Sequence, residues 1–152
     1  MKSFEKNLDK LKDECGVFGI YNQKKAVSLS VLGLHSLQHR GQESAGIISF
    51  KNNILHHHKG TGLVNEVFKG ISIEGDSAIG HVRYSTAGDQ RNENIQPLIA
   101  NTSLGKVAIA HNGNITNSRI LKKELTKKGQ IFQSTTDTEF ILSLLSLNNK
   151  DS

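Results

Sequence analysis

The sequence predicts an α+β fold with mainly antiparallel strands. Its segments follow the order strand, helix, several strands and then helices, and lack the regular alternation of strand and helix that a parallel sheet requires. Two of the strand candidates, AGIISF and NNILHHH, are separated only by a short turn, which makes them antiparallel neighbours. Apolar residues at helical spacing are confined to a few stretches between and after the strands.

The first half of the chain contributes one helix and three strands to this prediction. CGVFGIY, which begins at Cys15, is a short apolar run that we expect to form a buried strand. Residues 26–39 follow as an amphipathic helix with valine and leucine side chains at helical spacing, and this helix should end near Gly41. AGIISF and NNILHHH then form a hairpin around the turn at residues 51–53.

The second half contributes further strands and two helices. SAIGHVRYS, LIA and GKVAIAHNG are strand candidates, and residues 87–96 form a polar loop among them. Residues 117–128 predict a helix with Gly129 as its C-terminal cap. Thr136 and Glu139 stand at capping-box spacing ahead of FILSLLSL, the last predicted helix.

Composition limits the classes of protein to consider. The 152 residues, of which 36% are hydrophobic and 22% charged, suit one soluble globular domain. No apolar stretch approaches the roughly 20 residues of a membrane helix, and the N-terminus has no secretory signal. A single cysteine excludes an internal disulfide and favours the reducing cytoplasm. The net charge of +5 comes without an aromatic-interleaved basic patch, which argues against nucleic-acid binding.

The lone Cys15 follows a strongly charged stretch, residues 1–14, and stands at the start of an apolar run. One interpretation is an ordinary buried thiol. The other is a nucleophile that becomes the N-terminus once a leader of residues 1–14 is removed. An N-terminal cysteine carries both a thiol and a basic amine with a pKa near ~8, and this amine can take the proton of the thiol through a water molecule.

Three further polar segments stand at the ends of predicted elements: LQHRGQESAGI, GHVRYSTAG and HNGNI. Taken singly, each has a simple structural explanation. Arg83 could be a surface charge at a strand end, the Asn112–Gly113 pair a tight turn, and Asp137 a favourable charge in a first helical turn. The run at residues 56–58 is three histidines on a strand, which point to alternating faces and cannot all bind one metal ion.

In combination, CGVFGI, LQHRGQESAGI, GHVRYSTAG, HNGNI and TTDTE, in this order, resemble the class II glutamine amidotransferase domain. The wording HRGQESAGI and HVRYSTAG is most similar to the amidophosphoribosyltransferases of purine synthesis, many of which carry a leader ahead of the cysteine. The resemblance implies an N-terminal-nucleophile hydrolase fold, a four-layer αββα sandwich with two antiparallel sheets. It also implies that residues 1–14 are a propeptide and that residues 15–152 are the N-terminal part of the domain.

The resemblance implies a catalytic role for three residues. Cys15 would attack the side-chain amide of glutamine to give a γ-glutamyl thioester and ammonia. The side-chain amide of Asn112 and the backbone N–H of Gly113 would form the oxyanion hole, where glycine allows a close approach of the backbone.

Five more residues receive binding or supporting roles from the same resemblance. Arg83 would hold the α-carboxylate of glutamine through its planar guanidinium, and Thr86 would add a hydrogen bond at that end. Asp137 would hold the α-ammonium group. Arg40 and Gly41 would support the free amine of Cys15.

The complete enzymes of this kind use the ammonia to convert phosphoribosyl pyrophosphate into 5-phosphoribosylamine in a second domain. Magnesium, an iron–sulfur cluster in many leader-bearing relatives, and a homo-oligomeric assembly are implied for that longer protein. We expect no cofactor in residues 1–152 themselves, and we expect the domain to continue beyond them. Two alternatives stay open: a catalytically inert, truncated module that binds glutamine or a subunit, and a class II amidotransferase with a different ammonia acceptor.

Overall fold

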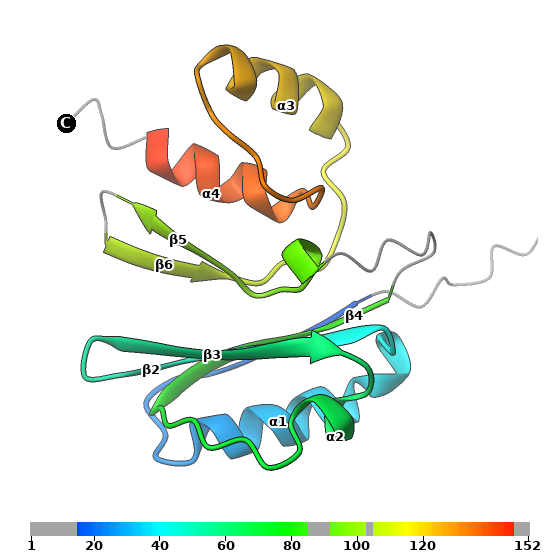
Figure 1. The fold of residues 1–152 in the computed structure, drawn as a ribbon, viewed down its shortest axis with the longest axis vertical. Helices are drawn as coiled ribbons and strands as arrows, with labels where there is room; N and C mark the ends of the chain where they lie inside the picture. Colours follow the sequence, from blue (N-terminus) through cyan, green and yellow to red (C-terminus); the bar gives the residue numbers. More distant parts are fainter. Residues whose placement is uncertain (1–14, 85–91, 103–104, 148–152) are drawn as a thin grey trace, which may run out of the picture.

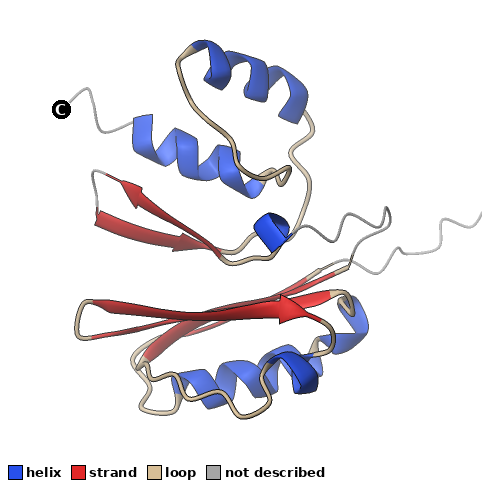
Figure 2. Cartoon of the chain, in the orientation of Figure 1, coloured by secondary structure: helices blue, strands red, loops and turns tan. Residues whose placement is uncertain are grey.

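The computed structural model describes residues 15–84, 92–102 and 105–147. Their helices and strands form four layers (Figure 1). Helices α1 (Ala26–Ser36) and α2 (Val64–Val67) cover the outer face of a four-stranded sheet. A two-stranded sheet lies on the other face of that sheet, and helices α3 (Ser118–Lys127) and α4 (Thr138–Leu147) form the last layer. Figure 2 shows the same layers with helices in blue and strands in red.

The first sheet has the strand order β1-β4-β2-β3, and every neighbouring pair is antiparallel. Its strands are β1 (Gly16–Ile20), β2 (Ser44–Lys51), β3 (Ile54–Thr61) and β4 (Ser77–Arg83). The second sheet pairs β5 (Leu98–Thr102) with β6 (Gly105–Ile109), also antiparallel. Short 3₁₀ helices at Gln38–Arg40 and Asn92–Asn94 precede β2 and β5.

The turn between β2 and β3 fixes the register of the hairpin. Asn52 and Asn53 have φ angles of +50° and +63°, a left-handed conformation that asparagine tolerates better than most residues. This two-residue turn places Lys51 opposite Ile54 and, further along, Ser44 opposite Thr61. The predicted hairpin is therefore confirmed.

The main hydrophobic core lies between the first sheet and helices α1 and α2. Its buried members are Ala26, Val27, Leu34, Ala45, Ile47, Val64, Phe68, Ala78 and Val82. Because successive side chains of a strand point to opposite faces, the neighbours of these strand residues face the second sheet instead. Three cross-strand pairs lie on that inner face: Ser44 with Arg83, Gly46 with His81, and Ile48 with Ile79.

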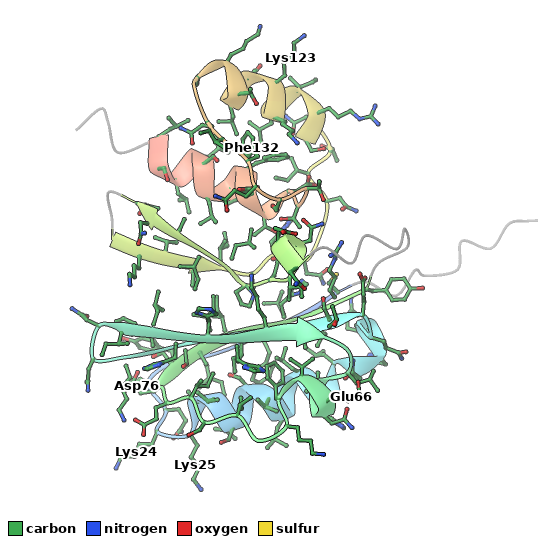
Figure 3. The ribbon with its side chains drawn as sticks, in the orientation of Figure 1. Lys24, Lys25, Glu66, Asp76, Lys123 and Phe132 are labelled. Atoms are coloured by element: carbon green, nitrogen blue, oxygen red, sulfur yellow. The ribbon has the colours of Figure 1, made fainter. Side chains whose placement is uncertain are left out.

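Helices α3 and α4 close the molecule on the far side of the second sheet. Figure 3 shows Phe132 directed between the two helices, whereas Lys123 projects outward. The ring of Phe132 meets that of Phe140 edge-on, with 5.1 Å between the ring centres. Lys128 is the C-cap residue of α3, and Gly129 follows with a φ of +83°, as predicted for a glycine cap.

Three details differ from the sequence predictions. β1 is an edge strand of its sheet and Val17 is 39% exposed, so the strand is not buried as predicted. The first helix ends at Ser36, and a turn at Leu37 leads into 3₁₀ helix from Gln38. Glu139 accepts hydrogen bonds from the backbone and hydroxyl of Ser134, so the expected capping box with Thr136 is not formed.

None of the helices in the described parts of the chain is long and apolar enough to cross a membrane.

Candidate active site

Cys15 lies directly ahead of β1, beside the carboxyl end of β4. Gly16 pairs with Val82 in an antiparallel register. Cys15, one residue before Gly16, therefore lies at the end of β4, one residue after Val82. The backbone N–H of Tyr84 donates to Sγ of Cys15 at 3.4 Å, and Sγ lies 3.7 Å from the carbonyl oxygen of the same residue. Cys15 is half-buried and forms no disulfide. The thiol is therefore held by backbone groups at a strand end while it keeps access to solvent.

The 3₁₀ turn that precedes β2 supports the residue carrying this thiol. Nε of Arg40 donates to the carbonyl oxygen of Cys15 at 3.3 Å. A Cβ on Gly41 would lie 2.6 Å from the carbonyl carbon of Val82 and 2.7 Å from the nitrogen of Arg83, closer than real side chains approach. Glycine therefore lets the turn pack directly on the backbone of β4. Both residues predicted to support Cys15 lie beside it or beside the strand end that holds it.

Arg83 is the last residue of β4 and is half-buried. It pairs with Ser44, and because Val82 faces the hydrophobic core, Arg83 faces the second sheet. The predicted carboxylate-binding side chain is thus next to the residue that contacts the thiol. Thr86, predicted to bind the same end of glutamine, lies outside the described residues, as do residues 1–14.

Asn112 and Gly113 follow the carboxyl end of β6 and are exposed. Gly113 has a φ of +142°, a backbone conformation that residues other than glycine rarely adopt. Oδ2 of Asp137 accepts a hydrogen bond from the backbone N–H of Ile115 at 2.7 Å. The predicted oxyanion residues and the predicted ammonium-binding residue therefore belong to one connected group, the second-sheet half of the site.

The carboxyl ends of β4 and β6 lie on the same side of the molecule (Figure 1). The structure thus places the predicted residues in two groups, one beside the end of β4 and one beyond the end of β6. Cys15, Arg40, Gly41 and Arg83 lie at or beside the end of β4 in the first sheet, and Asn112, Gly113 and Asp137 lie in the loops that follow β6 of the second sheet.

Sequence reasoning missed three buried or partly buried residues that hold the second-sheet half. Oε1 of Gln96 accepts a hydrogen bond from the backbone N–H of His111 at 2.8 Å. Asn94 forms two hydrogen bonds of 2.9 Å with Thr135. The carboxylate of Glu139 accepts hydrogen bonds from the backbone N–H groups of Gln133 and Ser134 at 2.8 Å. For Asn94 and Gln96, the only signal in the sequence was their polar character within the predicted loop. Nothing in the sequence pointed to this role for Glu139.

His81 is a further residue that the sequence did not single out. It is 1% exposed and lies on the inner face of β4, opposite Gly46. Burial lowers the pKa of its imidazole to about 4, and the charges of Arg83 and His111 act in the same direction, while the backbone of His111 opposes them. His81 is therefore neutral at physiological pH, between the two sheets.

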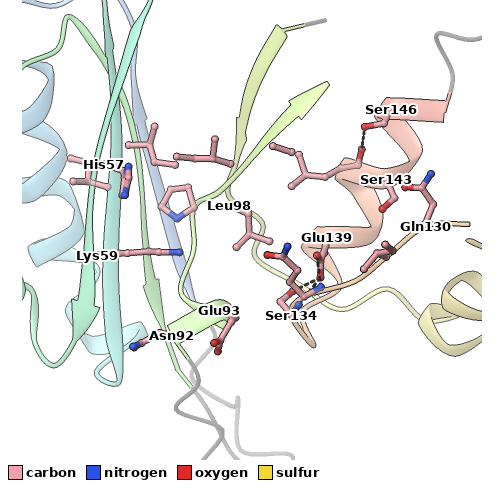
Figure 4. A pocket seen from close by; sticks show the side chains of 18 residues that line it. His57, Lys59, Asn92, Glu93, Leu98, Gln130, Ser134, Glu139, Ser143 and Ser146 are labelled. Atoms are coloured by element: carbon pink, nitrogen blue, oxygen red, sulfur yellow. Dashed lines mark hydrogen bonds between the residues drawn. The ribbon is translucent and has the colours of Figure 1, made fainter. Parts of the chain in front are cut away.

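A cavity elsewhere in the molecule is separate from these residues. It has a volume of about 750 Å³ and lies between β3, β5 and α4. Figure 4 shows His57 and Lys59 on one side, Ser143 and Ser146 on the opposite side, and Leu98 between them. Among the described residues, none that the sequence predicts for catalysis or glutamine binding lines it. We therefore place the candidate active site at the strand ends and not in this cavity.

The donor groups do not suit a metal centre. Among the described residues, no group of three or more histidine, cysteine, aspartate or glutamate side chains is placed to hold a metal ion. His56 and His58 pair with residues of the core-facing side of β2, and His57 pairs with Ile48 on the other side. One cysteine also cannot supply the four thiolates that an iron–sulfur cluster requires.

Comparison with known proteins identifies the family of the chain. Residues 67–151 match the family model of the glutamine amidotransferase domain. The chain is 49% identical to an amidophosphoribosyltransferase of Lacticaseibacillus casei over 139 residues, which cover 89% of this chain and 72% of that relative. It is also 49% identical to a chloroplastic amidophosphoribosyltransferase of Vigna aconitifolia over 140 residues, which cover 90% of this chain and 29% of that relative.

A solved structure shows the same fold. Glutamine phosphoribosylpyrophosphate amidotransferase from B. subtilis, complexed with ADP and GMP, superposes with a TM-score of 0.82 at 44% sequence identity, and the match covers 90% of this chain and 30% of that one. The chain belongs to the family of glutamine amidotransferase domains and has the α+β fold of N-terminal-nucleophile hydrolases. Within that family its branch is that of the amidophosphoribosyltransferases. It spans less than a third of the length of the Vigna and B. subtilis proteins.

Proposed function

We propose that this chain hydrolyses the side-chain amide of glutamine through a thioester on Cys15. The observation that carries the proposal is the placement of the thiol at the end of β4, bonded to the backbone of Tyr84 and next to Arg83. A thiol held by backbone groups at a strand end keeps a fixed direction of attack. Arg83 follows from the motif as the partner of the substrate carboxylate, and a guanidinium binds a carboxylate with two parallel hydrogen bonds.

The reaction runs in two steps. Sγ of Cys15 attacks the amide carbon, and Asn112 and Gly113 donate hydrogen bonds to the oxygen that becomes negative. The carbon–nitrogen bond breaks, the nitrogen takes up the proton that the thiol has lost, and ammonia leaves. Water then attacks the thioester, which releases glutamate and regenerates the thiol. Asp137 binds the α-ammonium group of the substrate throughout.

The base in this scheme is the α-amine of Cys15, which is free only if residues 1–14 are removed. We propose that the leader is cleaved after Glu14. Intact-mass measurement on the folded protein tests this step, because the mature chain should begin at Cys15. An active enzyme that retains residues 1–14 would show that another group removes the proton from the thiol.

In the longer protein, the ammonia would pass to phosphoribosyl pyrophosphate to give 5-phosphoribosylamine, the chemistry that the names of the relatives indicate. That step, with its magnesium requirement and a homo-oligomeric cytoplasmic enzyme, is proposed for the longer protein and not for these residues alone. Product analysis with phosphoribosyl pyrophosphate and glutamine, against other ammonia acceptors, tests it.

Labelling with a chloroketone analogue of glutamine tests the glutaminase proposal directly. The analogue should alkylate Cys15, and peptide mass mapping should locate the adduct there. Glutamine should protect the thiol, whereas glutamine analogues that lack the α-ammonium group should protect it poorly. Labelling that glutamine does not slow would contradict a glutamine site around Cys15.

A further inference from the structure

Asn94, Ile95 and Gln96 form a three-residue segment, here termed the brace, that is separated from β5 by Pro97 alone. All three residues are buried, with exposed fractions of 1%, 3% and 7%. Burial of two amide side chains is costly unless their hydrogen-bonding groups are satisfied. The partners that satisfy them lie in the two loops of the second-sheet half of the site.

The brace rests on the first sheet. A Cβ on Gly46, in the middle of β2, would overlap with the carbonyl oxygen of Gln96, so only glycine allows this close approach. Nζ of Lys59, on the neighbouring strand β3, donates to the carbonyl oxygen of Ile95 at 3.2 Å. Because the sheet holds the brace backbone at two points, the side chains of the brace start from a fixed position.

One side chain of the brace reaches the loop that carries Asn112 and Gly113, here termed the oxyanion loop. Oε1 of Gln96 accepts the backbone N–H of His111 at 2.8 Å, across a separation of 15 residues. Asn112 and Gly113, the proposed oxyanion donors, follow immediately. Since both are exposed, this bond is a buried anchor just ahead of them.

The other side chain of the brace reaches the loop that carries Asp137. Oδ1 of Asn94 accepts the backbone N–H of Thr135, and Nδ2 donates to Oγ1 of the same residue, both at 2.9 Å. Thr135 stands two residues ahead of Asp137. A pair of bonds from one amide to one residue fixes the orientation of this loop as well as its distance.

We propose that Gln96 and Asn94 are positioning residues with separate duties, Gln96 for the oxyanion hole and Asn94 for the ammonium-binding site. This inference rests on the proposed glutaminase function. An oxyanion forms only in the transition state, so a displaced oxyanion loop lowers kcat. The ammonium group is bound in the ground state and in the transition state alike, so a displaced Asp137 raises KM for glutamine.

Two substitutions of matched shape test the division of duties in the full-length protein. Gln96→Met removes the acceptor for His111, and we expect kcat to fall by about 10- to 100-fold with KM changed by less than about threefold, since a misplacement of ~1 Å can cost ~10²-fold in rate. Gln96→Glu keeps an acceptor oxygen and should recover most of kcat. Asn94→Leu should raise KM by about tenfold or more with a much smaller change in kcat.

A measurement that needs no turnover accompanies the kinetics. The amide of His111 should exchange with deuterium faster in Gln96→Met than in the native protein, because its acceptor is gone, and Asn94→Leu should leave that exchange unchanged. Asn101→Leu, at an exposed position on β5, is the control for the added apolar side chain and should change neither kinetics nor exchange.

Displacement of the whole brace offers a second test that leaves both amides intact. Gly46→Ala should push Gln96 away from the sheet and therefore change kcat and KM together. Gly19→Ala is the matched control in the same sheet, because its Cβ would lie at an ordinary 3.7 Å from Ile79.

The outcomes separate the two proposals. An active native enzyme in which Gln96→Met and Asn94→Leu share one kinetic pattern, or leave both constants unchanged, overturns the division of duties while the glutaminase stands. A native protein without glutamine turnover, in which the exchange of His111 still responds to Gln96→Met, overturns the catalytic roles of the brace together with the glutaminase.

Discussion

The two halves of the proposed site are held in different ways. On the first sheet, the contacts involve the backbone: the thiol of Cys15 meets the backbone of Tyr84, and Gly41 packs on the backbone of β4. On the second sheet, the loops are held by side chains from distant segments, chiefly Gln96 and Asn94. The position of the nucleophile thus follows mainly from the sheet, with one added side-chain bond from Arg40, whereas the oxyanion and ammonium sites depend on particular buried side chains.

This difference predicts unequal sensitivity to substitution. A contact between backbone groups survives most changes of side chain, but a buried backbone N–H that loses its acceptor costs about 1–3 kcal/mol. Apart from Gly41, where a side chain would meet the β4 backbone, and Arg40, substitutions around Cys15 should therefore act mainly when they change a reacting group. Substitutions around Asn112 and Asp137 should act also through residues that never touch glutamine.

The largest expected effect is that of Cys15→Ala. Without the thiol no thioester can form, so glutamine-dependent turnover should be abolished. In the full-length protein, turnover with added ammonium salt should continue, because the proposed acceptor site lies in another part of the protein. Product formation with glutamine and with ammonium salt, measured side by side, checks both statements. Glutamine-dependent turnover that survives the substitution would remove Cys15 from the chemistry.

The next effect concerns the second-sheet half. Asn112→Ala removes one oxyanion donor and should lower kcat by ~10²–10³-fold with little change in KM. Asn114→Ala, in the same exposed loop, is the control and should keep kcat within about threefold. Steady-state glutaminase kinetics distinguish the two variants. Equal losses in both would indicate a general disturbance of the loop and not the loss of a donor.

Local patterns were sufficient to predict most of the elements. The spacing of apolar residues located α1 and α3, and the asparagine pair located the β2–β3 turn, because these features depend on residues a few positions apart. The prediction that β1 is buried was wrong for a physical reason. Whether a strand is central or at an edge depends on the strand order β1-β4-β2-β3, which local patterns do not contain.

The site shows the same limit. Cys15, Arg83 and Asn112 stand in recognisable motifs, and the structure places each at a strand end. Gln96 and Asn94 bond to residues 15 and 41 positions away, so their role depends on the packing of the two sheets and not on any local motif. The pattern around Glu139 even predicted the wrong partner, because a capping box and the observed bonds to Ser134 use similar spacings.

His81, between the two halves, predicts a loss of stability in acid. The pKa of its imidazole is about 4 in the folded protein and about 6.5 when exposed, so the folded state binds fewer protons between these values. The contribution is complete above pH 6.5 and is lost as the pH falls toward 4. A difference of this size corresponds to roughly 3 kcal/mol.

Urea unfolding of the native protein and of His81→Gln, measured from pH 4 to 7, tests this contribution. The pH dependence of the free energy of unfolding should be shallower in His81→Gln. If the native protein and His81→Gln show parallel curves, His81 is not held neutral in the folded state.

The smallest expected effect returns to the first sheet. Arg83→Lys keeps the positive charge but replaces a planar guanidinium, which binds a carboxylate through two parallel hydrogen bonds, with a single ammonium group. The lost bond acts in the ground state and in the transition state alike, so KM for glutamine should rise about tenfold, equivalent to ~1.4 kcal/mol, while kcat changes little. Labelling of Cys15 by an electrophile that lacks an α-carboxylate should proceed at the native rate, because the thiol is held by the backbone of Tyr84 and not by the Arg83 side chain. If KM were unchanged, Arg83 would not be the carboxylate partner; if labelling slowed as well, the two halves would be less independent than their contacts indicate.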